Sequence, residues 1–108
     1  MYRGKMKSSL AEEIAGQLQI PPQELMESGA IAYLERELRL AKRDIADLRD
    51  RYGVLSPQQL EQLITVGKIY SHPAWEDLIV WENTLHHIEK LKELLEDANR
   101  SCLEFIII

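Results

Sequence analysis

Three side chains in the last third of the sequence have types and spacing that could bind a metal ion. Glu82, His86 and Glu89 occupy positions i, i+4 and i+7 of a predicted helix, so one helix face could present all three. Di-iron helical bundles instead repeat a Glu-x-x-His motif on two helices, and this sequence has no such motif. We therefore interpret this face, with His86 and His87 at its margin, as a solvated polar surface. We expect no metal and no other cofactor.

No other group of residues has the pattern of an active site. The sequence lacks a glycine-rich phosphate loop and a nucleophile with a recognisable base. His72 stands beside Pro73 and fits a helix start better than a general base. Cys102 has only Arg100 as a nearby cation in the sequence, so its thiol is a poor nucleophile. We expect no catalytic residues and no enzymatic activity; a metal-dependent helical enzyme is kept as a third hypothesis.

The two tryptophans suggest binding instead of catalysis. Trp75 and Trp81 are six residues apart, with Glu76 between them, and they point in different directions from a helix. Each could cover one end of a helical hairpin, or one could anchor a partner protein, as tryptophan often does at interfaces. Trp75, Glu76 and Trp81 are therefore candidate partner-binding residues.

The composition restricts the possible partners. The chain has 108 residues, enough for a single domain with a real core. Its 18 acidic and 13 basic residues give a formal net charge of -5, which argues against a general phosphate-binding surface. The best basic cluster is Arg3, Lys5 and Lys7, which we interpret as part of a solvated tail. DNA is not an expected partner.

The sequence also bears on the compartment. The single Cys102 cannot form a disulfide within the chain, which is compatible with a reducing environment. No apolar run approaches the length of a membrane span, and charged residues stand where a signal peptide needs an apolar core. We expect a soluble cytoplasmic protein that does not enter a membrane.

The strongest periodic pattern lies in residues 30–52, around which the rest of the chain is organised. Apolar residues recur there with alternating steps of three and four, the heptad register of a helix with one apolar stripe. In a parallel dimer Glu37 would face Lys42, and Asp44 would face Arg49, across this stripe. We expect it to be a dimer seam, used between two chains or within one. It consists of Ile31, Leu34, Leu38, Ala41, Ile45, Leu48 and Tyr52.

The segment before this helix predicts short helices. Ser9 and Glu12 have the spacing of a capping box, and the Pro21–Pro22 pair ends the first helix. A second short helix follows over residues 23–27, and Gly29 should separate it from the long helix. The order of a helix, a turn and a second helix is that of a helix-turn-helix motif, but the segment after the turn lacks the basic side chains of a recognition helix. We therefore interpret it as a packing unit.

Clear boundary signals mark the helices that follow. Gly53 fits the left-handed residue after a helix end. Ser56 and Gln59 form a capping box, with proline at the first helical position between them, and predict a short helix. A last long helix is expected over residues 73–98. Its apolar positions drift around the helix as ordinary 3.6-residue packing requires.

These elements predict an all-α fold. We expect an antiparallel hairpin of two long helices that are joined by a short helix and preceded by short N-terminal helices. We also expect the protein to be a dimer. Residues 1–108 form a single domain. Its parts are a flexible N-terminus (residues 1–8), short N-terminal helices (9–29), the helical hairpin (30–98) and an apolar tail (99–108).

The last nine residues, RSCLEFIII, do not fit the helical pattern. Isoleucine and phenylalanine are strong strand formers, and nothing else in the sequence looks like a strand that could pair with them. The tail could pack back on the bundle, pair with a partner's sheet, or be a loosely selected end. Its apolar residues Leu103, Phe105 and Ile106 are further candidates for partner binding.

One combination of motifs is familiar: a long charged helix ending in Arg-Tyr-Gly, a short helix led by serine, a glycine, and Trp-Glu twice on a final helix. The residues that carry it are Tyr52, Gly53, Ser56, Gly67, Trp75, Glu76, Trp81 and Glu82. Over residues 30–98 the chain resembles a group of small helical proteins of archaea and bacteria. These are often encoded beside a small toxin and are treated as antitoxins of toxin–antitoxin pairs.

Two functions therefore stay open besides the metal enzyme. The resemblance implies a non-catalytic protein-binding module, an antitoxin that binds and inhibits a cognate toxin. For this function we expect a basic partner, with the charged helix and the apolar tail as contact surfaces. The alternative is a structural, homodimeric coiled-coil or scaffold protein that associates through the seam.

Overall fold

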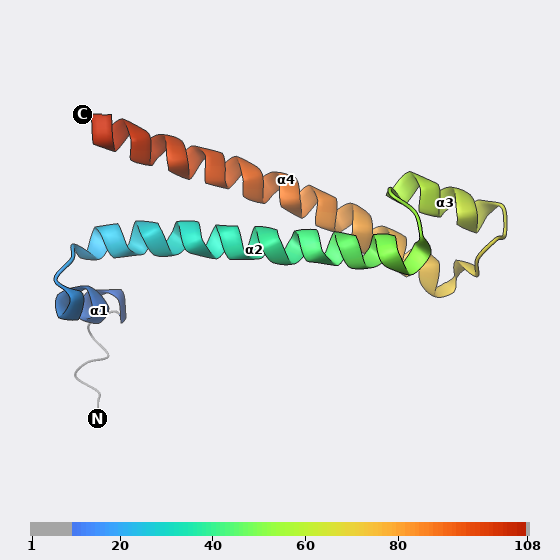
Figure 1. Ribbon diagram of the computed structural model, residues 1–108, viewed down its shortest axis with the longest axis horizontal. Coiled ribbons are helices and arrows are strands. Elements are labelled where there is room, and N and C mark those ends of the chain that lie inside the picture. The colour runs from blue at the N-terminus through green and yellow to red at the C-terminus, as the bar shows by residue number, and fades with distance from the viewer. Residues whose placement is uncertain (1–9, 108) are drawn as a thin grey trace, which may run out of the picture. The chain divides into compact units, whose positions relative to one another are not determined.

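All regular elements in the described part of the chain are α-helices. The computed structural model describes residues 10–107, and the side chains of residues 10–100. The helices are α1 (Leu10–Leu18), α2 (Pro22–Tyr52), α3 (Pro57–Thr65) and α4 (Ser71–Ile107), as Figure 1 shows. This confirms the all-helical class. The chain divides into two compact units, Met1–Leu34 and Glu35–Ile108.

The first unit contains α1 and the first turns of α2. In α1 the small residue Ala15 is fully buried, whereas Leu10 and Leu18 are largely exposed. After α1 the backbone turns at Gln19, which has a positive φ of 61°. Pro22 then stands at the first position of α2, where the lack of an N–H has no cost. The predicted cap at Ser9 lies outside the described residues.

The predicted helix break at Gly29 is wrong. α2 continues from Pro22 through Gly29 to Tyr52, so the expected short helix over residues 23–27 is the first part of α2. Glycine inside a helix costs only about 1 kcal/mol relative to alanine. The residues on both sides propagate the helix, and this outweighs the cost of one glycine.

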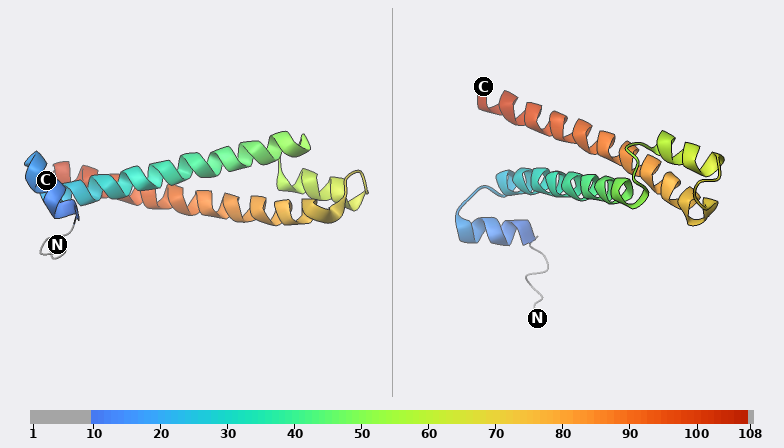
Figure 2. Two further views of the ribbon diagram at one scale, coloured as in Figure 1. Left: turned by 90° about the horizontal axis from the view of Figure 1, so that it is seen from below. Right: turned by 45° about the vertical axis from the view of Figure 1, so that its right-hand side comes forward.

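The second unit has its core between α2, α3 and α4. The last turns of α2, from residue 35, run antiparallel to α4, and α3 lies beside the first turns of α4 (Figures 1 and 2). Trp81 and Leu60 are the largest side chains that are fully buried. The core cluster consists of Ala41, Ile45, Leu48, Val54, Leu60, Ile64, Ala74, Leu78, Trp81 and Ile88, with Leu38, Tyr52, Leu63, Ile69 and Leu85 packed against it.

Local signals set the end of α2 and the start of α3 as predicted. Gly53 has a φ of 65°, and its N–H donates to the carbonyl of Arg49 at 2.8 Å. Ser56 is extended, and its Oγ accepts a hydrogen bond from the N–H of Gln59 at 3.2 Å. The Oε1 of Gln59 in turn accepts from the N–H of Leu55 at 2.8 Å. The capping box therefore satisfies donors that the start of α3 would leave unpaired.

The predicted start of the last helix is confirmed, and its predicted end at residue 98 is wrong, because α4 continues to Ile107. The backbone is non-helical at His72, with φ -118° and ψ 122°, so uninterrupted helix begins at Pro73. Residues 100–107 form the last turns of α4. β-Branched residues lower helix propensity by only tenths of a kcal/mol each, and extending a formed helix needs no new nucleus. Among the described helices, none is both long and apolar enough to cross a membrane.

Candidate protein-interaction surfaces

The structure places most of the predicted dimer seam in the core of a single chain. Ala41, Ile45 and Leu48 are buried, and Leu38 and Tyr52 pack against the same core. The remaining seam residues, Ile31 and Leu34, belong to the first unit and are half-buried. The Leu38–Tyr52 part of the stripe therefore packs against α3 and α4 and is not a free surface.

The two tryptophans have different environments. Trp81 is fully buried in the core, whereas Trp75 is 43% exposed on the surface of α4. Ile79 lies one turn beyond Trp75 on the same face and is 55% exposed. Glu76 is exposed on another side of the helix, where Nδ1 of His72 lies 3.8 Å from its Oε2. The structure thus does not bring Trp75, Glu76 and Trp81 onto one surface.

The tail candidates Leu103, Phe105 and Ile106 lie in the last turns of α4, but their side chains are outside the described residues.

The metal-binding interpretation of Glu82, His86 and Glu89 receives no support. Within residues 10–100, no three His, Cys, Asp or Glu side chains are grouped so that they could hold a metal ion.

A polar cluster ties the end of α2 to the start of α4. Tyr52 Oη and Arg51 Nη1 both donate to Oδ2 of Asp77, the latter at 2.9 Å. Burial raises the pKa of the Tyr52 phenol, and the hydrogen bond to Asp77 raises this pKa further. The hydrogen bond to Asp77 also raises the pKa of Arg51. The cluster keeps the phenol neutral and fixes which turns of the two helices lie beside each other.

On one face of the second unit, α2 and α4 form a shallow groove. Its volume is about 320 Å³, and its lining is Glu37, Leu40, Ala41, Asp44, Asn83, Thr84 and His87. Asp44, Asn83 and His87 are exposed. The groove combines an apolar floor with the two carboxylates of Glu37 and Asp44, both from α2.

α4 carries more apolar surface than α2 covers. Beside its core-facing positions runs a second line of residues with the same alternating steps of three and four: Val80, Thr84, His87, Leu91 and Leu94. Leu91 is buried, but Val80 is 49% exposed and Leu94 is similarly exposed. Thr84 and His87 of this line also line the groove. The spacing of this second line was the sequence signal for the groove, and our sequence analysis missed it.

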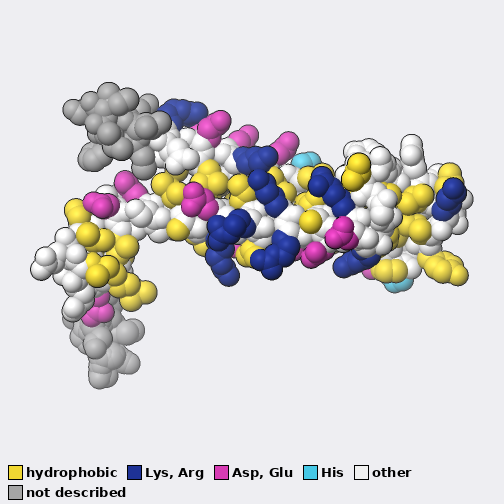
Figure 3. Space-filling model, in the orientation of Figure 1, with side chains coloured by type: hydrophobic (Ala, Val, Ile, Leu, Met, Phe, Trp, Pro, Cys, Tyr) yellow, Lys and Arg dark blue, Asp and Glu magenta, His cyan; other side chains and the backbone are white. Residues whose placement is uncertain are grey.

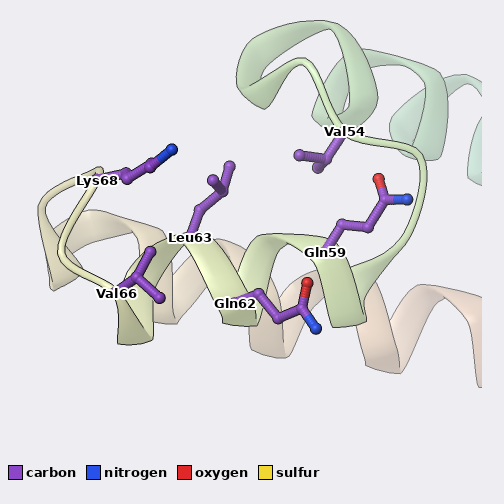
Figure 4. Close-up of a pocket in the computed structure, with 6 residues that line it drawn as sticks. All are labelled: Val54, Gln59, Gln62, Leu63, Val66 and Lys68. Atoms are coloured by element: carbon purple, nitrogen blue, oxygen red, sulfur yellow. The ribbon is translucent and has the colours of Figure 1, made fainter.

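A second hollow lies between α3 and the turn before it. It has a volume of about 660 Å³ and is lined by Val54, Gln59, Gln62, Leu63, Val66 and Lys68. In Figure 4, the side chains of Val54, Gln59, Leu63 and Lys68 project toward one another across it. Gln59 Oε1 is already bound to the N–H of Leu55, so Gln59 and Lys68 offer the hollow mainly donors.

Exposed apolar residues lie around these features as well as in the first unit. Within residues 55–80 the large apolar side chains of Leu55, Val66, Tyr70, Trp75, Ile79 and Val80 are all exposed. In Figure 3 hydrophobic side chains gather around α3, and Lys and Arg side chains gather where α2 and α4 lie side by side. Such surfaces are typical of a protein that binds another protein.

The fold and these surfaces define a small all-helical protein with an uncovered groove between two antiparallel helices. The chain belongs to a family described as the Uncharacterized protein MJ0235 family, whose model matches residues 6–102. The match includes α1 and the start of α2, which lie outside the stretch that resembles antitoxins. The family's description makes no statement about toxins. No curated protein and no solved structure matches the chain.

Proposed function

We propose that this chain is a non-catalytic protein-binding module whose groove between α2 and α4 receives a helix of a partner protein. The observation that carries this proposal is the second apolar line of α4, which leaves Val80 and Leu94 exposed beside the groove. When the apolar face of a helix is wider than the area that the neighbouring helix covers, another helix commonly binds to the uncovered part.

The charges of the groove indicate the chemistry of the partner. Glu37 and Asp44 lie one above the other on α2, two turns apart, at the edge of the apolar floor. Nη1 of Arg36 lies 3.9 Å from Glu37, a weak and exposed pair. We therefore infer a basic amphipathic helix, whose Lys or Arg side chains pair with these carboxylates while its apolar side chains cover Val80 and Leu94.

An inhibitor of a toxin is the specific form of this function that the resemblance to antitoxins suggests. A small basic toxin would meet the charge requirement of the groove. Blocking an active site by covering it needs binding alone, without chemistry from this chain.

The test is to capture partners from the native cytoplasm with tagged wild-type chain and with two matched variants. Val80→Arg puts a cation and a large side chain beside the groove, so capture of a basic partner should fall about tenfold or more. Val66→Arg makes the same change at an exposed valine that does not line the groove, and should retain the partner. If both variants capture the same proteins as the wild type in the same amounts, the groove is not the binding surface.

A structural homodimer is the second candidate function. The Leu38–Tyr52 part of its predicted seam packs within one chain, so a dimer of this folded form needs another surface.

A further inference from the structure

The hollow beside α3 is a separate surface from the groove between α2 and α4. The two features have no lining residue in common. Four of the residues that line the hollow occupy positions i, i+3, i+4 and i+7 along α3 and its C-cap, so they share one side of this helix: Gln59, Gln62, Leu63 and Val66. The buried residues of α3 lie on another side, against the core. The side that faces the hollow is therefore available to a ligand.

The end of α3 fixes a cation at the hollow. Gly67 has a φ of 76°, and its N–H donates to the carbonyl of Ile64 at 3.1 Å. The N–H of Lys68 donates to the carbonyl of Leu63 at 3.0 Å, and the two bonds together form a Schellman motif. The backbone of Lys68 is thereby held beside Leu63, and Figure 4 shows its side chain extending toward the hollow. Within the described part of the chain, this ammonium group forms no ion pair.

The start of α3 fixes a hydrogen-bond donor at the other end of the hollow. Oε1 of Gln59 accepts from the N–H of Leu55 at 2.8 Å, so the donor Nε2 is the group of this amide that remains for a ligand. In Figure 4 Lys68 and Gln59 stand at opposite ends of the hollow, and Leu63 and Val54 lie between them. The hollow therefore presents a donor, an apolar floor and a cation, in that order.

No carboxylate is among the described residues that line the hollow. The one acidic residue of α3, Glu61, is two positions from both Gln59 and Leu63, so it lies on the other side of the helix. The whole chain has a formal net charge of -5, so a cation without an acidic group beside it in the lining is a local exception. Charge complementarity therefore requires a ligand with a negatively charged acceptor.

From this arrangement we propose that the hollow is a docking site for a peptide segment of another protein that carries a carboxylate next to a large apolar side chain. The carboxylate pairs with Lys68, and the apolar side chain lies on Leu63 and Val54. A backbone carbonyl of the segment accepts a hydrogen bond from Nε2 of Gln59. This acidic segment differs from the basic helix proposed for the groove, and neither proposal depends on the other.

The exposure of the hollow favours a peptide over a small molecule. Val66 is 65% exposed, and Gln62 and Lys68 are exposed too. A small-molecule site usually buries most of its ligand, whereas a peptide side chain is held in place by the rest of its chain. Leu55 and Tyr70, in the segments before and after α3, are 71% and 89% exposed. They offer further apolar surface to the rest of a peptide.

The experiment follows the backbone amide chemical shifts of the full chain by NMR while N-acetyl-leucine is added. This probe has a carbonyl, an apolar side chain and a carboxylate in the proposed order. The shifts should concentrate on the amides of residues 54–68, with a dissociation constant on the order of a few millimolar, as expected for a ligand of this size. N-acetyl-leucinamide replaces the carboxylate by a neutral amide, and it should bind about threefold more weakly at the same amides.

Variants of the chain locate the charge that the probe recognises. Lys68→Met should bind N-acetyl-leucine about threefold more weakly and no longer prefer it to the amide. Lys90→Met, at an exposed lysine of α4 that does not line the hollow, should bind like the wild type, and so should Val80→Arg beside the groove. Octanoate has a carboxylate and an apolar body but no carbonyl for Gln59, and it should bind more weakly than N-acetyl-leucine at these amides.

Four results would each overturn the proposal. They are an absence of shifts at residues 54–68, equal affinity for the acid and its amide, unchanged affinity in Lys68→Met, and tighter binding of octanoate at these amides. The last result would assign the hollow to lipid-like carboxylates instead of peptides. The comparison of acid with amide is made on the wild type alone, so it holds even if a variant fails to fold.

Discussion

The polar cluster of Arg51, Tyr52 and Asp77 allows a quantitative prediction about the stability of the second unit. Tyr52→Phe removes one hydroxyl group and keeps the ring that packs against the core. The lost bond runs from a half-buried phenol to a carboxylate, and hydrogen bonds to charged groups contribute roughly 1.5–3 kcal/mol to stability. Asp77 keeps Arg51 as a partner and is partly open to water. We therefore expect a loss of about 1–2 kcal/mol.

The assay is urea unfolding at neutral pH followed by circular dichroism, with Tyr70→Phe as the matched control. Tyr70 is 89% exposed, so its hydroxyl should matter by less than about 0.5 kcal/mol. Both variants should keep the slope of the free energy of unfolding against urea, because the surface exposed on unfolding is unchanged. If Tyr52→Phe is no less stable than Tyr70→Phe, the contact with Asp77 does not stabilise the fold.

The pH dependence provides a second check on the same contact. The pKa of Tyr52 is raised in the folded chain, so its neutral form stabilises the fold fully below the ordinary tyrosine pKa of about 10. This stabilisation is lost as the pH rises through the raised pKa. The stability difference between wild type and Tyr52→Phe should therefore shrink above about pH 10. A difference that stays constant there would contradict the link between the phenol's proton and stability.

Two further stability measurements test the core and the start of α3. Leu60→Ala, at a fully buried position, should lower the free energy of unfolding by about 3 kcal/mol in urea titrations. Leu55→Ala, at a position 71% exposed, should change it by less than about 0.5 kcal/mol, and equal effects would contradict the described core. Ser56→Ala removes the cap of α3 and should cost about 1 kcal/mol. Ser28→Ala, inside α2, should be neutral or slightly stabilising, because alanine is the better helix former.

The sequence predicted the helices best where the signal was local. The capping box of Ser56, the left-handed Gly53 and the start at Pro73 each depend on a backbone conformation or a hydrogen bond within a few residues. Two local expectations were wrong, the break at Gly29 and the end of the last helix at residue 98. In both places one unfavourable local preference was outweighed by the propagation of a long helix, which a residue-by-residue reading underestimates.

The candidate surfaces were harder to predict because burial depends on which side of each helix its neighbours occupy. Trp75 and Trp81 lie on one helix six residues apart, yet one is half exposed and the other is fully buried. The second apolar line of α4, from Val80 to Leu94, was readable from its spacing. What the sequence did not show is that α2 leaves it partly uncovered.

The sequence by itself determined the all-helical class, the ends of α2 and α3 and the apolar stripe of α2, because these follow from helix periodicity, capping and backbone preference. Only the tertiary structure decided that residues 38–52 of the stripe pack within one chain. It also brought Asp77 to Tyr52 and Arg51. These features depend on the register between two antiparallel helices. That register is fixed by contacts between residues some 25 positions apart, which no local pattern specifies.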